Sequence, residues 1–279
     1  MHFGSVVVFR ALPLVVTLAL GCVARGAEVN QSKAAAEAAK GHAREELGVN
    51  EFTTPSIETV LQALRDLRPM PYDSVARDPS PQNPPDRAKL ALSTGGTIAE
   101  GLLAVAAEKQ ARIEPIGRVL LRQAKGLGVA EHVTRHSKSI IDKAATKDWP
   151  GIRAELIGTQ RDVEKGMLAL KDEEIAHLVA LGGWWRGLEM TTGIISAQYS
   201  PERAALLVQP AVLDYFADRV SKLNPAFQTS KLWAALSGGL REVRRLAVKD
   251  SGAPPTVEEV RSMLALARLT NELVNAPSE

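Results

Sequence analysis

Two pairs of residues in this 279-residue chain have the spacing of metal ligands. His132 and His136 are four positions apart, which would place both imidazoles on one side of a helix. Glu174 and His177 form an E-x-x-H, a motif that helical di-metal proteins use twice together with further glutamates. No second E-x-x-H lies on another helical segment, and the residues between the two histidines, Val-Thr-Arg, include no glutamate to act as general base. We therefore expect no cofactor, and a metal-binding bundle or enzyme built from these four residues is the alternative.

The segment 172–198 contains the most informative polar residues. Taken as a helix, it is apolar on nearly all sides, which predicts a central helix that is buried all round. Arg186 and Glu189 are three positions apart and can pair on one turn, which favours an ion pair inside the core. In the alternative hypothesis Arg186 holds an anionic group in a pocket. The candidate pocket residues are Trp184, Trp185, Arg186 and Glu189, with His136 and His177 as titratable groups.

A row of small residues follows one side of the same segment. Gly183, Gly187 and Thr191 are spaced by four, so they lie above one another on a helix. Glycine inside a helix is unfavourable by about 0.5–1 kcal/mol relative to alanine, so a compensating contact is expected. The row predicts the close approach of a second helix, or alternatively the floor of a ligand groove.

The stretch STGGTIA, residues 93–99, resembles the TGGT loop of the bacterial asparaginase family. The resemblance implies a threonine nucleophile, Thr94 or Thr97, placed after a strand of an α/β domain. The flanking sequences DRAKLAL and EGLLAVAAEKQ are helix-forming, however, and a second signature similar to HGTDT is absent. We therefore interpret Gly95-Gly96 as a helix break, with Ser93 or Thr94 capping the helix that follows.

The rest of the chain predicts an all-α, multi-helix bundle. Helical periodicity recurs almost throughout without an alternating strand pattern, and aromatic residues make up only 4% of the chain. Six prolines between 69 and 85 exclude a regular element there and indicate a linker or a strap over the bundle. The expected helices are 28–47, 56–68, 86–93, 96–112, 115–126, 129–146, 150–169, 172–198, 201–222, 229–248 and 256–275.

The first 26 residues have the pattern of a secretory signal peptide. Arg10 precedes about ten apolar residues, and small residues follow up to Gly26. The alternative is a lipoprotein signal, in which Cys22 of LALGC is the lipidated residue. We expect four parts in the chain, namely a signal peptide (1–26), an N-terminal helical arm (27–68), the Pro-rich linker or strap (69–85) and the helical bundle (86–279).

Charge and cysteine content limit the function. Residues 1–26 hold two arginines and no acidic residue, so the remainder carries 32 basic and 32 acidic residues. A neutral chain without a long basic run is not expected to bind nucleic acid. Cys22 is the only cysteine, so the mature chain is expected to have no disulfide, and it is expected to have no membrane span. We predict an exported periplasmic or envelope-associated protein that binds an unknown protein or small ligand and is not an enzyme.

Overall fold

The computed structural model describes residues 57–80, 82–170, 172–223, 225–228 and 230–276. These residues contain helices and no strand, so the predicted all-α, multi-helix fold is confirmed. None of the described helices is both long and apolar enough to cross a membrane. The expected signal peptide, Cys22 and the expected helix 28–47 lie outside the described residues.

Several of the described helices begin at a polar residue whose side chain caps them. The side chains of Asp86, Ser200 and Thr256 each accept a hydrogen bond from the backbone N–H three residues on. At Thr256 the side chain of Glu259 completes a capping box. The helices are α2 (Ile57–Asp66), α3 (Tyr72–Val75), α4 (Arg87–Ala106), α5 (Gln110–Leu127), α6 (Ala130–Ala145), α7 (Trp149–Leu170), α8 (Glu173–Ala197), α9 (Pro201–Ala205), α10 (Pro210–Ser221), α11 (Pro225–Gln228), α12 (Lys231–Ala247) and α13 (Val257–Asn275).

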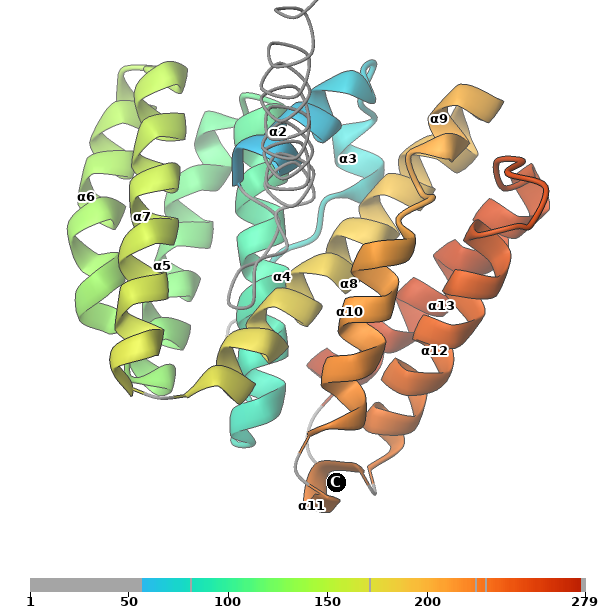
Figure 1. The fold of residues 1–279 in the computed structure, drawn as a ribbon. Helices are drawn as coiled ribbons and strands as arrows, with labels where there is room; N and C mark the ends of the chain where they lie inside the picture. Colours follow the sequence, from blue (N-terminus) through green and yellow to red (C-terminus); the bar gives the residue numbers. More distant parts are fainter. Residues whose placement is uncertain (1–56, 81, 171, 224, 229, 277–279) are drawn as a thin grey trace, which may run out of the picture. The chain divides into compact units, whose positions relative to one another are not determined.

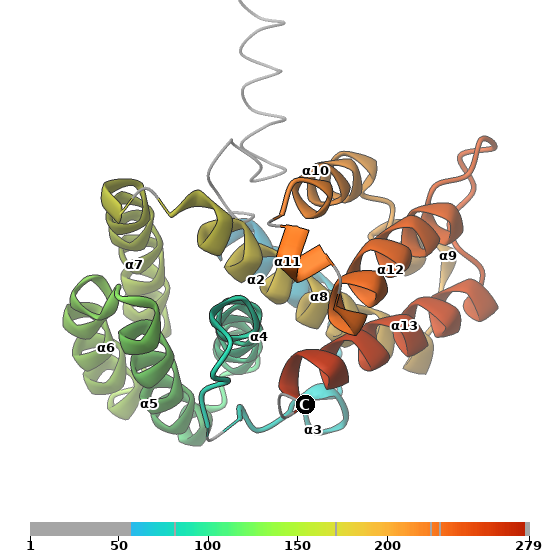
Figure 2. The same cartoon turned by 90° about the horizontal axis from the view of Figure 1, so that it is seen from below.

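The arrangement is centred on two helices, α4 and α8, which cross at an oblique angle (Figure 1). Helices α5, α6 and α7 stack in order on the side of α4, whereas α10, α12 and α13 pack on the side of α8. Figure 2 shows the same division from below. The predicted central helix 172–198 is confirmed as α8, whose buried residues occupy all of its sides.

The predicted helix break at Gly95-Gly96 is wrong, because α4 runs unbroken through both glycines. Thr94 and Thr97 donate their hydroxyl hydrogens to backbone oxygens four residues earlier, at 2.7 and 3.0 Å, as threonines inside a helix do. Neither residue caps a helix or follows a strand, so neither has the setting of an asparaginase-type nucleophile.

The glycines of α4 and α8 instead allow the two backbones to touch. A Cβ atom on Gly95 would lie 2.0 Å from the carbonyl oxygen of Val179, and one on Gly182 would lie 2.0 Å from that of Leu92. A Cβ on Gly183 would lie 3.3 Å from the oxygen of Gly95. The close helix approach predicted around Gly183 therefore exists, but Gly187 takes no part in it, since a Cβ there would meet nothing within 4 Å.

Three further element predictions need correction. The helix expected over 96–112 ends at Ala106, and α5 begins at Gln110, before the expected start at 115, and includes Pro115 in its first two turns. The single helix expected over 201–222 is divided into α9 and α10, because Pro210 begins α10 and the residue before a proline disfavours helical backbone. The Pro-rich segment (69–80 and 82–85 in the described part) contains the short helix α3, although the prolines predicted no regular element there.

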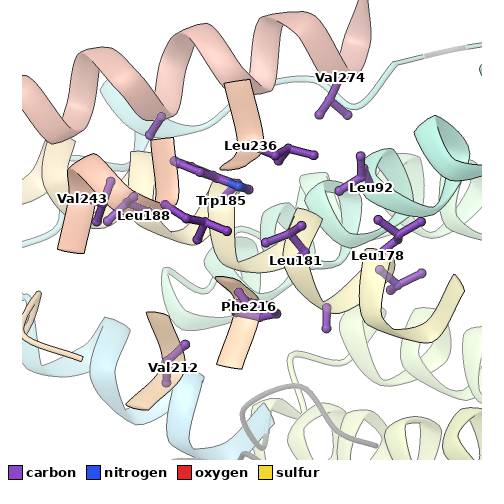
Figure 3. Close-up of a cluster of buried hydrophobic side chains, with 14 of the residues drawn as sticks. Leu92, Leu178, Leu181, Trp185, Leu188, Val212, Phe216, Leu236, Val243 and Val274 are labelled. Carbon is purple, nitrogen blue, oxygen red and sulfur yellow. The ribbon is translucent and has the colours of Figure 1, made fainter. Parts of the chain in front are cut away.

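The core consists of two clusters of buried apolar side chains. The larger one surrounds α8 with residues from α4, α10, α12 and α13, and Trp185 lies at its centre with no exposed surface (Figure 3). The smaller one joins the second half of α4 to α2, α3, α5 and α7. At the α4–α8 crossing itself the residues are small, Gly95, Gly182 and Gly183, which fits the close spacing of the two helices there.

Three successive helices, α4, α5 and α6, end in the same left-handed turn. The residue after the C-cap has a positive φ at Glu108 (56°) and Lys147 (58°), and Gly128 at the end of α5 has φ 82°. In each case the next N–H bonds to a carbonyl oxygen five residues back, as in a Schellman motif. Glycine is the usual residue in this conformation, so Glu108 and Lys147 are in strained backbone.

Glu108→Gly is therefore expected to raise the free energy of unfolding by about 1 kcal/mol, because glycine adopts this φ without a clash at Cβ. Ala107, one residue earlier, has φ −89°, so Ala107→Gly relieves no strain and should lower stability by about 0.5–1 kcal/mol. Urea unfolding followed by circular dichroism measures both variants. If the two glycine substitutions changed the free energy of unfolding equally, the backbone at Glu108 would not be strained.

Candidate functional site

The most unusual polar feature is a cluster of charged side chains buried between α4, α8 and α13. Arg186 on α8 lies 2.6 Å from Oε1 of Glu100 on α4, and 3.0 Å from Oε2 of Glu189, the pair that sequence spacing predicts. Asn271 on α13 donates a hydrogen bond to the same oxygen of Glu189 at 2.9 Å. These four side chains are all buried, with 3–5% of their surface exposed. We call these four side chains, together with Arg77 of the Pro-rich segment, the charge cluster.

The Pro-rich segment covers the charge cluster and completes it. Arg186 donates to the carbonyl oxygen of Val75, and the backbone N–H of Arg77 donates to Oε2 of Glu100 at 3.1 Å. The guanidinium of Arg77 forms an ion pair with Glu189. Two carboxylates therefore face two guanidinium groups, and the second of these comes from the Pro-rich segment.

The carboxylates of the charge cluster are paired with donors of the protein itself. Burial raises the pKa of Glu100 above its usual value, while the positive charge of Arg186 opposes the shift. Each carboxylate oxygen of Glu100 and Glu189 has a donor within the described residues. The four buried side chains, paired and hydrogen-bonded in this way, connect α4, α8 and α13 and leave little capacity to bind a substrate, whereas the side chain of Arg77 reaches solvent.

The two tryptophans of the predicted pocket belong to the core and do not line an opening. Trp185 is fully buried, and a Cβ atom on Gly239 of α12 would approach its ring to 2.8 Å. Trp184 is half-buried and packs against Trp185 and Phe216, with ring centroids 5.2 and 5.6 Å apart. The structure thus brings Trp184, Trp185, Arg186 and Glu189 together along α8, but inside packed surroundings.

His177 lies on another side of α8 and pairs with α10. Its Nδ1 is 2.8 Å from the hydroxyl of Tyr215, and the two rings meet edge to face. Burial lowers the pKa of His177, and the positive charge of Arg219 lowers it further. Burial also raises the pKa of Tyr215, so the pair consists of a neutral imidazole and a neutral phenol at pH 7.

The lowered pKa of His177 predicts a loss of stability in acid. The unfolded chain, in which histidine has its ordinary pKa of about 6.5, binds the proton more readily than the folded chain. The contribution of His177 to the free energy of unfolding is therefore constant above about pH 6.5 and is lost as the pH falls below this value. Urea unfolding of wild type and His177→Phe should show a smaller decline between pH 7.5 and 5 in the variant. Substitution of the partly exposed His132 by Gln is the control and should retain the wild-type decline.

His136 lies in a separate ionic network between α6 and α7. Its Nδ1 is 2.8 Å from Glu155 and its Nε2 is 3.1 Å from Asp162, and Gly158 of α7 leaves room for the ring. The hydrogen bond from His136 is the main cause that lowers the pKa of Glu155 to about 2, and Lys143 adds to the shift. Both ring nitrogens of His136 are therefore engaged by carboxylates that join the two helices.

The structure does not bring the four residues of the metal alternative together. His136 contacts α7, His177 contacts α10, Glu174 is exposed and His132 is half-buried. Among the residues that the structure describes, no group of three or more His, Cys, Asp or Glu side chains is arranged to hold a metal ion.

An opening in the described surface lies elsewhere, between the Pro-rich segment and the end of α4. This groove has a volume of about 560 Å³. On one wall Lys109 places its Nζ 4.9 Å from the ring centroid of Tyr72, while the side chain of Asp73 is 91% exposed. The lining residues are Arg68, Pro69, Met70, Pro71, Tyr72, Asp73, Ser74, Ala107, Glu108 and Lys109.

Sequence reasoning missed Glu100, Arg77 and Asn271 of the charge cluster. Glu100 is the only charged residue between Lys89 and Glu108, in an otherwise apolar and small-residue helix. A single charge in such surroundings indicates a buried ion pair and could have been matched to Arg186. Arg77 and Asn271 carry no comparable signal.

Comparisons of the chain with family models, with curated proteins and with solved structures find no match.

Proposed function

We propose that this protein is an exported, non-enzymatic binding protein of the cell envelope, and that the groove beside the Pro-rich segment contacts its partner. Export rests on the signal-peptide pattern of residues 1–26. A non-enzymatic role is supported by the fact that the side chains best suited to acid–base chemistry are already bound by other groups of the protein. Glu100, Glu189, His136 and His177 are each held by neighbouring groups of the protein itself.

The groove is the observation that carries the proposal. Small-molecule sites are lined mostly by apolar side chains with a few polar groups. This groove has apolar walls from Pro69, Met70, Pro71 and Ala107. Beside the ring of Tyr72 it also presents charges of both signs, from Arg68, Asp73, Glu108 and Lys109. Such a lining suits an extended polar segment of a partner protein, which would find both donors and acceptors along its length.

Site-specific photo-crosslinking tests the groove. A photoreactive amino acid at Asp73 or Lys109 in producing cells should give one crosslinked partner of defined mass. The same amino acid at Glu258, an exposed position at the start of α13, is the matched control and should not. Identical products from all three positions, or none from Asp73 and Lys109, would refute the groove as the contact surface.

Mass spectrometry of the mature N-terminus tests export separately. Cleavage after Gly26 gives a chain that begins at Ala27, whereas a lipoprotein begins at a lipidated Cys22. Fatty-acid labelling that is present in wild type and absent in Cys22→Ala would establish the lipoprotein. A chain that retains residues 1–26 and stays in the cytoplasm would overturn the proposed location without bearing on the groove.

A further inference from the structure

Two surface arginines from different elements converge on one oxygen of Glu189. Arg77, in the Pro-rich segment, forms an ion pair with Oε1, and Nε of Arg268, on α13, lies 3.9 Å from the same atom. The carboxylate is only 5% exposed, whereas the side chains of Arg77 and Arg268 are 40% and 55% exposed. A buried carboxylate therefore underlies two guanidinium groups that reach solvent.

Glu189 does not satisfy both arginines. Its other oxygen, Oε2, already accepts from Arg186 and Asn271. Within the charge cluster, Glu100 and Glu189 together balance Arg186 and Arg77. Arg268 is a third positive charge beside these two carboxylates and is therefore in surplus, and at 3.9 Å it forms no hydrogen bond with Glu189.

Arg268 has no closer partner among the residues that the structure describes. Its side chain is 55% exposed, and it lies within ion-pair distance of the same oxygen of Glu189 that Arg77 contacts. Arg112 donates a hydrogen bond to the backbone oxygen of Arg77 at 3.0 Å, but its charge is balanced by Asp78 at 2.6 Å. The excess charge is thus localised at the junction of the Pro-rich segment and α13.

We propose that Arg77 and Arg268 form a binding site for a phosphate group. A guanidinium presents a planar fork of N–H donors that matches phosphate and carboxylate oxygens. The two forks come from different elements, so an anion with oxygens in several directions accepts from both, and phosphate carries enough negative charge for two cations. Glu189 holds Arg77 in place from below, and Arg186 offsets the repulsion between that carboxylate and the bound anion.

Phosphate titration of the purified full chain tests the site. The Nε–H resonances of the arginines are followed by NMR as inorganic phosphate replaces chloride at constant ionic strength. Arg268→Gln is expected to weaken phosphate binding by about tenfold or more, since one charge-assisted fork is lost. Arg261→Gln, also on an exposed position of α13, removes the same charge and should leave the affinity unchanged.

The source of the phosphate is distinguished by vesicle sedimentation. Binding to phosphatidylglycerol vesicles but not to phosphatidylcholine vesicles, lost in Arg268→Gln, assigns a lipid headgroup. Binding of inorganic phosphate alone assigns a soluble phosphate compound.

Three results would overturn the site. The first is the absence of binding to both inorganic phosphate and phosphatidylglycerol vesicles. The second is an equal loss of phosphate affinity in Arg261→Gln and Arg268→Gln. The third is a shift of the arginine resonances by acetate at a lower concentration than by phosphate. The last result would point to a carboxylate ligand, such as an acidic segment of a protein. None of these outcomes depends on the groove, so failure of this site and failure of the proposed function are separate.

Discussion

Gly182→Ala is expected to lower the free energy of unfolding by about 3 kcal/mol, at the upper end of what overpacking usually does. The added Cβ would lie 2.0 Å from the carbonyl oxygen of Leu92 and 2.6 Å from its carbonyl carbon. These are backbone atoms of α4, so no side chain can rotate away to make room. The two central helices must separate, and the contacts of both core clusters weaken with them. Urea unfolding followed by circular dichroism measures the change.

Gly187→Ala is the matched control on the same helix. A Cβ at this position meets nothing within 4 Å, so the substitution only adds helix propensity and should stabilise by about 0.5–1 kcal/mol. Opposite signs at positions only five residues apart would show that backbone contact, and not the loss of glycine as such, determines the effect. Similar values for the two variants would refute the close crossing of α4 and α8.

Arg186→Met is expected to destabilise the protein by about 3–5 kcal/mol, the range seen when one partner of a buried ion pair is removed. Glu100 and Glu189 would both remain buried without the guanidinium that lies between them. The carbonyl oxygen of Val75 would also lose its donor, so the Pro-rich segment should become less protected from hydrogen exchange. Unfolding free energy and exchange rates of this segment are the two measurements.

Two further variants separate charge from packing in this second prediction. Adding Glu100→Gln to Arg186→Met removes the negative charge that Glu100 would carry without its guanidinium partner. The double variant should therefore recover part of the lost stability. Arg244→Met breaks a pair with Asp214 that is about half exposed, and a surface pair of this kind contributes ~1 kcal/mol or less. If the double variant were no more stable than Arg186→Met alone, the burial of unpaired charge would not be the cause.

The sequence predicts the helices of this fold better than their contacts. Capping residues such as Asp86 and Thr256 act within one turn, so they can be recognised from neighbouring residues. Gly95-Gly96 was misinterpreted as a break, because a glycine pair in isolation looks the same whether the chain turns there or another helix presses against it. Only the position of α8, distant in sequence, distinguishes the two.

The candidate site shows the same limit. The pairing of Arg186 with Glu189 follows from their spacing on one helix, but the closer partner Glu100 is 86 positions away. Likewise His136 and His177 were recognised as titratable residues, whereas their partners Glu155 and Tyr215 depend on which helices pack side by side. Spacing along one helix is readable from sequence, and proximity between helices requires the fold.

Helix α4 has a consequence for how the protein unfolds, because it contributes side chains to both hydrophobic clusters. Its first half belongs to the larger cluster and packs with α8 and α13, and its second half belongs to the smaller one and packs with α2, α5 and α7. Neither side of the bundle can lose its core without removing support from the helix on which the other side is built. The described bundle should therefore behave as one cooperative unit, with a single transition and no stable half-folded form.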